Sequence, residues 1–412
     1  MAAAVSALVI APAPSYDPWA WLLWGREIAH GTLSTAEGPA FKPLPVAATA
    51  LLAPLGGAAP VVWVILARAG TVLAVVLGFR LGRRLAGGSV AAGVAAASGV
   101  ALCGALLRYT AAGAEPGWVI ALALAGGEAW RTGRPRAALA CGIGCALLRV
   151  EAWPFLLAFA VLLWRRRPQD RPLLVACAVA VPALWFVPEL IGSGDPLRSG
   201  SRARVPNPGQ PALADVPAWA ALRAAAALPL WPLWIGALAA PRAARPLLYA
   251  GLAWIALVAV MAQAGFSGEP RYSLPGAALV AIAGAAGLGR TPRALVAVLL
   301  VVAAVPKLAD LPDLRRDQAY QRALAADLRT AIRAAGGRAA LLACGRPYVG
   351  ELRGPLLAYH LDVEKRRVGF APRAPGVEFR SRLAPGRPVE PPAAFSPRVR
   401  TVRWEVRSTC AS

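Results

Sequence analysis

Acidic and basic side chains recur at the borders of apolar segments, where they could transfer a proton or bind an anion. A carboxylate can take the proton of a hydroxyl group, and an arginine can neutralise a phosphate through two parallel hydrogen bonds. A single acid at such a border is more often a solvated or capping residue. The recurrence of acids at several borders is what indicates a functional site. The sequences concerned are Asp17-Pro18, Glu115-Pro116, Arg149-Val150-Glu151, Asp195-Pro196 and Glu269-Pro270-Arg271-Tyr272.

The composition is that of a membrane protein. Of the 412 residues, 58% are hydrophobic, the mean hydropathy is +0.53, and the apolar residues form blocks, as membrane spans do. The net charge is +23, but the arginines form short clusters between these blocks. No basic face is interleaved with aromatic residues, so we exclude nucleic acid as a partner.

The basic clusters predict the topology. The short connections between them hold one arginine each, Arg108, Arg149 and Arg271. By the positive-inside rule the basic connections are cytoplasmic, and the others are extracytoplasmic together with loops 14–45 and 191–217 and the tail. The basic connections, with 14 Lys and Arg in total, are 80–84, 131–136, 165–171, 242–245 and 290–293.

The apolar stretch 137–164 is interrupted by Arg149 and Glu151 and allows two interpretations. One long helix would place the basic cluster 165–167 outside. Two short helices that meet at Arg149-Val150-Glu151 keep this cluster cytoplasmic, and we favour this hairpin. Because charges at membrane depth are costly, both side chains are expected to line a cavity or contact a partner.

Three further segments outside the apolar blocks have distinct compositions. The Trp-rich segment 19–24 is expected to form a helix that lies in the membrane interface. Loop 191–217 is rich in Gly and Pro, and it is either a flexible connector or a lid whose arginines meet a phosphate. The apolar segment 1–13 is short for a span; we expect a first helix clipped by a late start codon, with a short complete helix as the alternative.

The tail, residues 307–412, is predicted to be a small extracytoplasmic α/β domain, and residues 1–306 the transmembrane domain. An amphipathic helix is predicted over 317–335, a strand over 338–344, and a helical stretch through Tyr359. Cys344 and Cys410 could form a disulfide in an oxidising compartment, or they could stay unpaired. With only two histidines in the chain, a His-based metal site is not expected.

This arrangement resembles the GT-C superfamily of membrane glycosyltransferases. The shared features are an acid in the first large outer loop, Asp17, many spans, and a soluble domain after the last span. The segments that look like motifs of actinobacterial members are Asp17–Trp21 with Phe41–Pro45, Leu148–Phe155 and Gly268–Pro275. Arg149-Val150-Glu151 departs from the expected Arg-Pro-Glu but keeps both charges. The resemblance covers about residues 14–290.

The resemblance implies an all-α polytopic plasma-membrane protein, GT-C-like, with about 10–11 transmembrane helices. It implies an inverting hexosyl or pentosyl transfer from a polyprenyl-phosphate-linked sugar to an envelope glycan, lipid or protein. Asp17 is then the expected base. Some members use a divalent metal, so Mg²⁺ or Mn²⁺ stays open as a cofactor. The residues expected to bind donor or phosphate are Lys42, Glu115, Arg149, Glu151, Arg202, Arg204, Glu269, Arg271 and Tyr272.

Other interpretations stay open. A transporter or flippase of lipid-linked intermediates would carry charged residues toward both faces and inverted repeats, and the sequence shows neither. A non-catalytic scaffold whose tail binds a partner would leave the loop acids replaceable. At the level of single residues, Asp17 could simply cap the Trp-rich helix, and Arg149 with Glu151 could be a structural ion pair.

Overall fold

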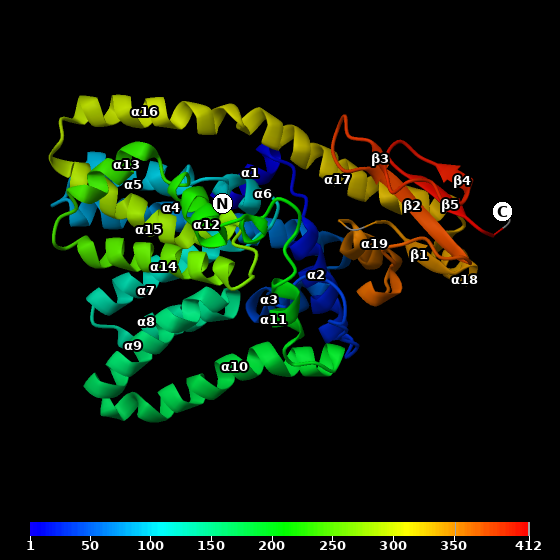
Figure 1. The fold of residues 1–412 in the computed structure, drawn as a ribbon, viewed down its shortest axis with the longest axis horizontal. Helices are drawn as coiled ribbons and strands as arrows, with labels where there is room; N and C mark the ends of the chain where they lie inside the picture. The colour runs from blue at the N-terminus through cyan, green and yellow to red at the C-terminus, as the bar shows by residue number, and fades with distance from the viewer. Residues whose placement is uncertain (351, 411–412) are drawn as a thin grey trace.

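A bundle of apolar helices forms most of the structure, and a smaller unit that contains a sheet lies at one end of it (Figure 1). The computed structural model describes residues 1–350 and 352–410. The helices of the bundle are α1 (Ala2–Val9), α3 (Pro43–Leu52), α4 (Ala59–Leu85), α5 (Val90–Ala101), α6 (Leu106–Ala111), α7 (Pro116–Arg131), α8 (Pro135–Leu148), α9 (Trp153–Arg166), α10 (Arg171–Ser193), α12 (Pro217–Ala226), α13 (Trp231–Leu238), α14 (Arg245–Gln263), α15 (Pro270–Gly287) and α16 (Arg293–Ala309).

The predicted all-α polytopic membrane fold is confirmed. In the described part of the chain, 5 helices are long and apolar enough to cross a membrane, or up to 6 if α12 and α13, which are bent by 95°, form one span. Further predicted crossings correspond to apolar helices shorter than the roughly 20 residues that a comfortable span needs, such as α5 and α8. The protein is therefore a multi-pass membrane protein, part of whose bundle consists of short helices.

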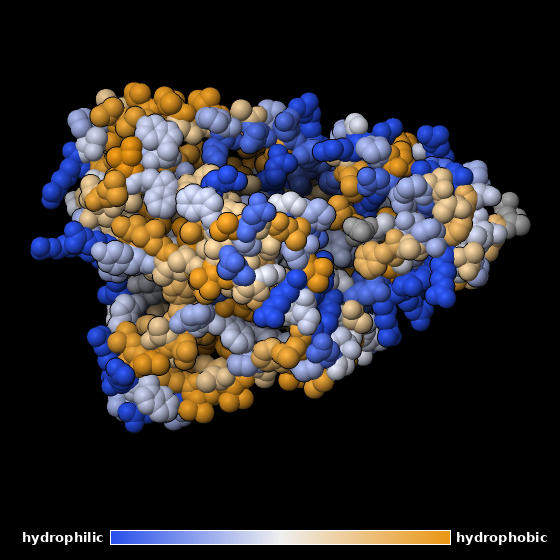
Figure 2. All heavy atoms as spheres, viewed as in Figure 1, coloured by the Kyte–Doolittle hydropathy of each residue, from blue (hydrophilic) through white to orange (hydrophobic). Residues whose placement is uncertain are grey.

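The outer surface of the bundle is suited to lipid. Helix α16 exposes Leu295, Val298, Val301 and Val305 along its length. Figure 2 shows apolar residues over the helical part of the molecule, whereas hydrophilic residues gather at the far end of the bundle and over the sheet-containing unit. Side chains of this type are stable next to acyl chains but not next to water.

The five basic connections lie together at the end of the bundle that is remote from the sheet. Arg84 pairs with Glu128 of α7 at 2.5 Å, and Gly289 approaches Ala86. The opposite end carries the acid-containing loops together with α2 (Tyr16–Ala29) and α11 (Arg198–Ala203). The segregation of basic connections from acidic loops, which the charge count predicted, is present in the structure.

The stretch 137–164 is a hairpin, as we favoured. Helix α8 ends at Leu148, Arg149 is extended (φ −147°, ψ 128°), and α9 begins at Trp153. The two far ends meet, because Arg136 Nε donates to Asp170 Oδ1 at 2.9 Å. Arg149 and Glu151 therefore lie at the turn of the hairpin, and the basic cluster after α9 returns to the end where α8 began.

Helix α15 is the centre of the bundle, and residues 273–286 of it are buried. Glycines let neighbouring backbones approach it closely: a Cβ added at Gly284 would collide with the carbonyl of Leu233, and one at Gly287 with that of Gly236. Small residues at helix contacts maximise van der Waals packing where lipid supplies no hydrophobic drive. Arg271 and Tyr272 lie at the other end of α15, directly before its buried part begins at Ser273.

The Trp-rich segment is helical, as predicted, but its tryptophans pack inside the protein; its position in the membrane interface stays a prediction. Trp19, Trp21 and Trp24 are buried in α2, which packs between α3 and the sheet-containing unit. Thr49 Oγ1 donates to the carbonyl of Trp21 at 2.6 Å, and the ring centroid of Trp19 lies 5.2 Å from that of Tyr359. The sheet-containing unit covers Trp19, whereas Trp21 packs against Trp63 and Trp24 against Phe41.

The sheet-containing unit has the order β1-β2-β5-β4, with β3 beside β2. Strands β1 and β2 are parallel, and the other pairs are antiparallel. Its helix α17 packs Leu324 and Leu328 against Phe379 and Trp404.

The elements of this unit are α17 (Leu311–Ala334), α18 (Gly337–Cys344), β1 (Arg346–Tyr348), α19 (Gly354–Leu361), β2 (Gly376–Arg382), β3 (Val389–Glu390), β4 (Ser396–Arg400) and β5 (Glu405–Ser408). Short 3-10 helices complete the chain, namely η1 (Ala53–Ala58), η2 (Val150–Ala152), η3 (Pro168–Asp170), η4 (Pro211–Leu213), η5 (Leu288–Arg290) and η6 (Lys365–Arg367).

Two local predictions for this tail need correction. The segment 338–344 is the helix α18, not a strand, because its Ala and Leu residues favour helix. The first strand, β1, follows after Gly345, whose φ of 139° redirects the chain. The amphipathic helix begins at Leu311, earlier than predicted, and follows α16 after one residue. The predicted domain boundary after Pro306 falls inside α16, and the division into two domains stays a prediction.

The structure joins Cys344 to Cys410 by a disulfide. The bond links the end of α18 to the chain after β5 and so closes the sheet-containing unit. Among the described residues, the other four cysteines are unpaired and lie in the bundle.

Replacing Cys410 by serine is expected to destabilise the sheet-containing unit. The two cysteines are 66 positions apart, and a crosslink over such a loop removes about 4 kcal/mol of unfolded-state entropy. Protease resistance of this unit against temperature measures the loss. Cys177→Ser, which changes an unpaired and partly buried thiol, is the control. Equal resistance of Cys410→Ser and Cys177→Ser would contradict the expectation.

Candidate functional site

A buried ionic cluster lies where three chain segments meet at the acid-bearing end of the bundle. Glu115, which is 1% exposed, is the shared acid. Its Oε1 lies 2.5 Å from Lys42 Nζ and 2.8 Å from Arg149 Nη2, and Glu151 lies 3.7 Å from Arg149 on the other side. One carboxylate thus compensates two cations from segments 73 and 34 positions away in the sequence.

The local sequence explains why these side chains converge. Lys42 and Glu115 each directly precede a proline that starts a helix, Pro43 of α3 and Pro116 of α7. Proline at the first helical position fixes φ and loses no hydrogen bond there. Arg149 lies at the turn between α8 and α9, where an extended residue is required. All three residues therefore stand at helix borders, where side chains can reach past the helix ends.

A second cluster surrounds Arg271 at the start of α15. Its Nη1 lies 3.0 Å from Asp17 Oδ2, and its Nε lies 2.9 Å from Glu269 Oε2. The hydroxyl of Tyr109 donates to Glu269 at 3.1 Å. Asp17 does not cap α2, whose N-cap is Ser15; it lies in the first turn and contacts Arg271 instead.

Tyr272 links the two clusters. The guanidinium carbon of Arg149 lies 4.3 Å from the centroid of its ring, and that of Arg271 lies 5.3 Å from it. An aromatic ring attracts cations through its negative face. The predicted residues thus form one connected polar network from Asp17 to Lys42, at the border of an otherwise apolar bundle.

The electrostatics of the first cluster favour an ionised Glu115. Burial raises the pKa of this carboxyl, but the charges of Arg149 and Lys42 outweigh it and hold the pKa well below the ordinary value of 4.5. Only one of its oxygens is used, since Oε2 is buried without a hydrogen-bond partner among the described residues.

A cavity of about 720 Å³ opens beside the first cluster. Its polar end presents Lys42, Arg149, Glu151 and Tyr272, with Arg204 and Ser267 nearby. The Ser267 hydroxyl is buried and finds no partner in the described part of the chain. The remainder of the wall is largely apolar and includes Trp153, Trp185, Phe186, Val258, Met261 and Phe266.

The other predicted residues divide between this cavity and its surroundings. Asp17, Glu115, Glu269 and Arg271 are not part of the wall of the cavity, and they reach it through Tyr272 and Arg149. Arg204 belongs to the wall and lies over the ring of Phe266, 4.9 Å from its centroid. Arg202 points elsewhere and donates to the carbonyl of Val205 at 2.9 Å.

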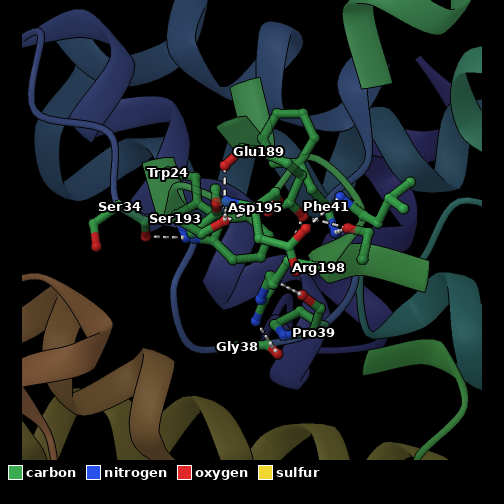
Figure 3. A network of polar contacts seen from close by, with 12 residues as sticks. Trp24, Ser34, Gly38, Pro39, Phe41, Glu189, Ser193, Asp195 and Arg198 are labelled. Atoms are coloured by element: carbon green, nitrogen blue, oxygen red, sulfur yellow. Dashed lines mark hydrogen bonds and ion pairs between the residues drawn. The ribbon is translucent and has the colours of Figure 1, made fainter. Parts of the chain in front are cut away.

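The sequence analysis did not predict the contacts that hold α11 in the wall of the cavity. Helix α11 and the turn before it form part of the wall, so loop 191–217 is more than a flexible connector. Ser199 and Arg198 of α11 contact Glu189 of α10 (Figure 3). A lone acid near the end of an apolar helix is a signal that could have identified Glu189.

The acids of the site are engaged with Arg and Lys. In residues 1–350 and 352–410, no three His, Cys, Asp or Glu side chains form a group that could hold a metal ion. The side chains of the cavity wall instead offer cations to an anionic ligand.

Comparison with known proteins supports the fold. No protein-family model matches the chain, and a search of curated proteins gives no match. The crystal structure of ArnT from Cupriavidus metallidurans bound to undecaprenyl phosphate is similar over 97% of this chain and 94% of that chain, with a TM-score of 0.53 and 15% sequence identity. The GT-C-like fold that the sequence predicted is therefore confirmed.

Replacing Glu115 by glutamine is expected to destabilise the protein strongly, because Lys42 and Arg149 lose their shared counter-charge. Removing one partner of a buried ion pair costs about 3–5 kcal/mol. Since the folded-state pKa of Glu115 is depressed, its contribution is present above the ordinary value of 4.5 and fades as the pH falls further.

Thermal unfolding of wild type and Glu115→Gln at pH 7 and at lower pH tests this. The gap between their melting temperatures should be large at pH 7 and should narrow below pH 4.5. Glu128→Gln is the matched control, because Glu128 pairs with Arg84 at the exposed end of the bundle, where a pair contributes less than about 1 kcal/mol. A gap for Glu115→Gln no larger than that of the control would refute the expectation.

Proposed function

We propose that this protein is a membrane glycosyltransferase. It transfers a sugar from a polyprenyl-phosphate-linked donor to a hydroxyl of a glycan, lipid or protein on the extracytoplasmic face. One observation carries the proposal: a largely apolar cavity of about 720 Å³ has Lys42 and Arg149 in its wall. A ligand with a long hydrocarbon chain and a phosphate head matches both parts of such a site.

The charges of the cavity suit a phosphate. Lys42, Arg149 and Arg204 face the cavity against a single acid, Glu151. Glu115, which is not part of the wall, compensates Lys42 and Arg149, which are. The planar guanidinium groups can each bind two phosphate oxygens.

The fold gives independent support. The ArnT structure, which shares this fold over nearly the whole of both chains, is described as bound to undecaprenyl phosphate, a polyprenyl phosphate. We extend that ligand class to this chain because its cavity combines a cationic end with an aromatic and aliphatic wall.

The reaction we propose is a single displacement with inversion. The oxygen of the acceptor hydroxyl attacks the anomeric carbon of the sugar. The bond from that carbon to the phosphate oxygen breaks, and its electron pair stays on the polyprenyl phosphate. Asp17 accepts the hydroxyl proton, and Lys42 and Arg149 stabilise the charge on the leaving phosphate. Arg271, 3.0 Å from Asp17, orients the carboxylate.

The sidedness rests on the charge distribution. The basic connections lie at one end of the bundle, which the positive-inside rule assigns to the cytoplasm. The proposed site and the disulfide-bonded unit lie at the other end, and disulfides persist in extracytoplasmic compartments. We therefore assign the site and the unit to the extracytoplasmic face of the plasma membrane.

Arg204→Gln is expected to weaken binding of a polyprenyl-phosphate sugar by about 10-fold or more, since a hydrogen bond to a charged group contributes about 1.5–3 kcal/mol. Arg202→Gln is the matched control, because it removes the same charge two positions away, where the side chain turns to the Val205 carbonyl. Titration of donor into purified protein measures both dissociation constants. Equal losses in the two variants would argue against the assigned phosphate site.

Asp17→Asn is expected to lower kcat for sugar transfer by about 100-fold or more, the usual contribution of a general base, with donor affinity and melting temperature close to wild type. Asp317→Asn, which alters an exposed pair with Arg108, is the control. Assays use radiolabelled polyprenyl-phosphate sugar and purified protein in lipid. Full activity of Asp17→Asn would remove Asp17 as the base, and failure of the wild type to bind any donor would overturn the proposed function.

A further inference from the structure

Glu189 of α10 is a fully buried carboxylate outside the cavity wall. Its Oε2 accepts a hydrogen bond from Thr35 Oγ1 at 2.7 Å, and its Oε1 accepts one from the hydroxyl of Ser199. Arg198 Nη1 lies 3.5 Å from the same carboxylate. One side chain of a membrane helix thus holds two segments far apart in the sequence.

These contacts continue to the residue before Lys42. Arg198 donates to the carbonyls of Gly38 and Pro39, at 2.8 Å each. The backbone N–H of Phe41 donates to Ser199 Oγ at 2.7 Å. Figure 3 shows Arg198 between Glu189 and the Gly38–Pro39 turn. The Ser199 hydroxyl donates to Glu189 and accepts from Phe41. It therefore links the carboxylate to the segment that carries Lys42.

Helix α11 depends on this connection. It has six residues and no side-chain N-cap, and so short a helix is not stable by itself. In the part of the chain that the structure describes, its hydrogen bonds and ion pairs to other elements all go to Glu189 or to residues 38–41. Residues 31–41 are held more broadly, because Glu37 also pairs with Lys365 of the sheet-containing unit at 3.0 Å.

We propose that Glu189 is a positioning residue that holds α11 against the cavity and so fixes Lys42 and Arg204 in its wall. An apolar side chain at this place would avoid the cost of burying a charge, but it could not bind Thr35, Ser199 and Arg198 together. This inference deepens the proposed function and rests on it only for the ligand that the cavity takes. Glu189 does not face the cavity, so it acts through α11 and Phe41 and not on the substrate.

The experiment combines a measurement without donor and one with donor, on the full-length purified protein. In Glu189→Ala, trypsin cleavage after Arg202 or Arg204 is expected to be at least 10-fold faster than in wild type, because α11 is released. The KM for the polyprenyl-phosphate sugar is expected to rise at least 10-fold, and kcat is expected to fall as well, because a displaced Lys42 stabilises the leaving phosphate less. Glu189→Gln, which keeps one acceptor oxygen, should lie in between.

Glu128→Ala, an acid removed from the opposite end of the bundle, is the control and should match wild type in both measurements. If Glu189→Ala cleaves like wild type, or lowers kcat without changing KM, the positioning role is overturned. If Glu189→Ala is not recovered folded, Ser199→Ala tests the proposal by the same two measurements. This variant loses the hydrogen bonds of the Ser199 hydroxyl to Glu189 and Phe41 but leaves Arg198 beside the carboxylate. Because cleavage needs no donor, absence of sugar transfer in wild type would count against the proposed function and not against this inference.

Discussion

The structure around the cavity depends on one buried carboxylate with two cationic partners. Glu115 lies 2.5 Å from Lys42 and 2.8 Å from Arg149, and it supplies the counter-charge that both need, because an uncompensated buried charge is costly. The three residues come from the starts of α3 and α7 and from the turn between α8 and α9, so their pairing fixes how these helix ends meet. Both cations also belong to the wall of the cavity.

Two further parts of the site adjoin this pairing, and they are held by different numbers of contacts. Tyr272 connects it to Arg271 and Asp17 from the start of α15, which is held by close glycine contacts along most of its length. On the other side, α11 closes the cavity and is held by Glu189 and residues 38–41 alone among its polar partners described by the structure. The chemistry proposed for Asp17 therefore lies beside the closely packed α15, and the short α11 lies on the side held by fewer contacts.

Sequence reasoning predicted the features that follow from composition and local pattern. Charge counting separated the two ends of the bundle, and the interruption at Arg149 predicted the hairpin between α8 and α9. It also selected most residues of the polar network, since acids and arginines beside apolar blocks are rare. It did not separate Arg202 from Arg204, because the direction of a side chain in a loop depends on tertiary contacts.

Other errors have the same origin. The burial of the Trp residues of α2 does not follow from the sequence, which does not show that α19 packs against Trp19. The segment 338–344 was assigned to a strand although its residues favour helix. Glu189 was overlooked because its partners, Thr35 and Ser199, are ordinary polar residues whose proximity only the fold reveals.

The shortness of α8 has a consequence for the membrane itself. Its 14 residues extend about 21 Å, less than the hydrocarbon thickness of about 30 Å. With the basic end of the hairpin at one surface of such a bilayer, Arg149 would lie several ångströms below the headgroups of the opposite leaflet. The bilayer must thin around this hairpin, or a lipid phosphate must sink below its neighbours to meet the guanidinium. Bilayer thickness would then govern how readily a lipid-linked substrate reaches the protein.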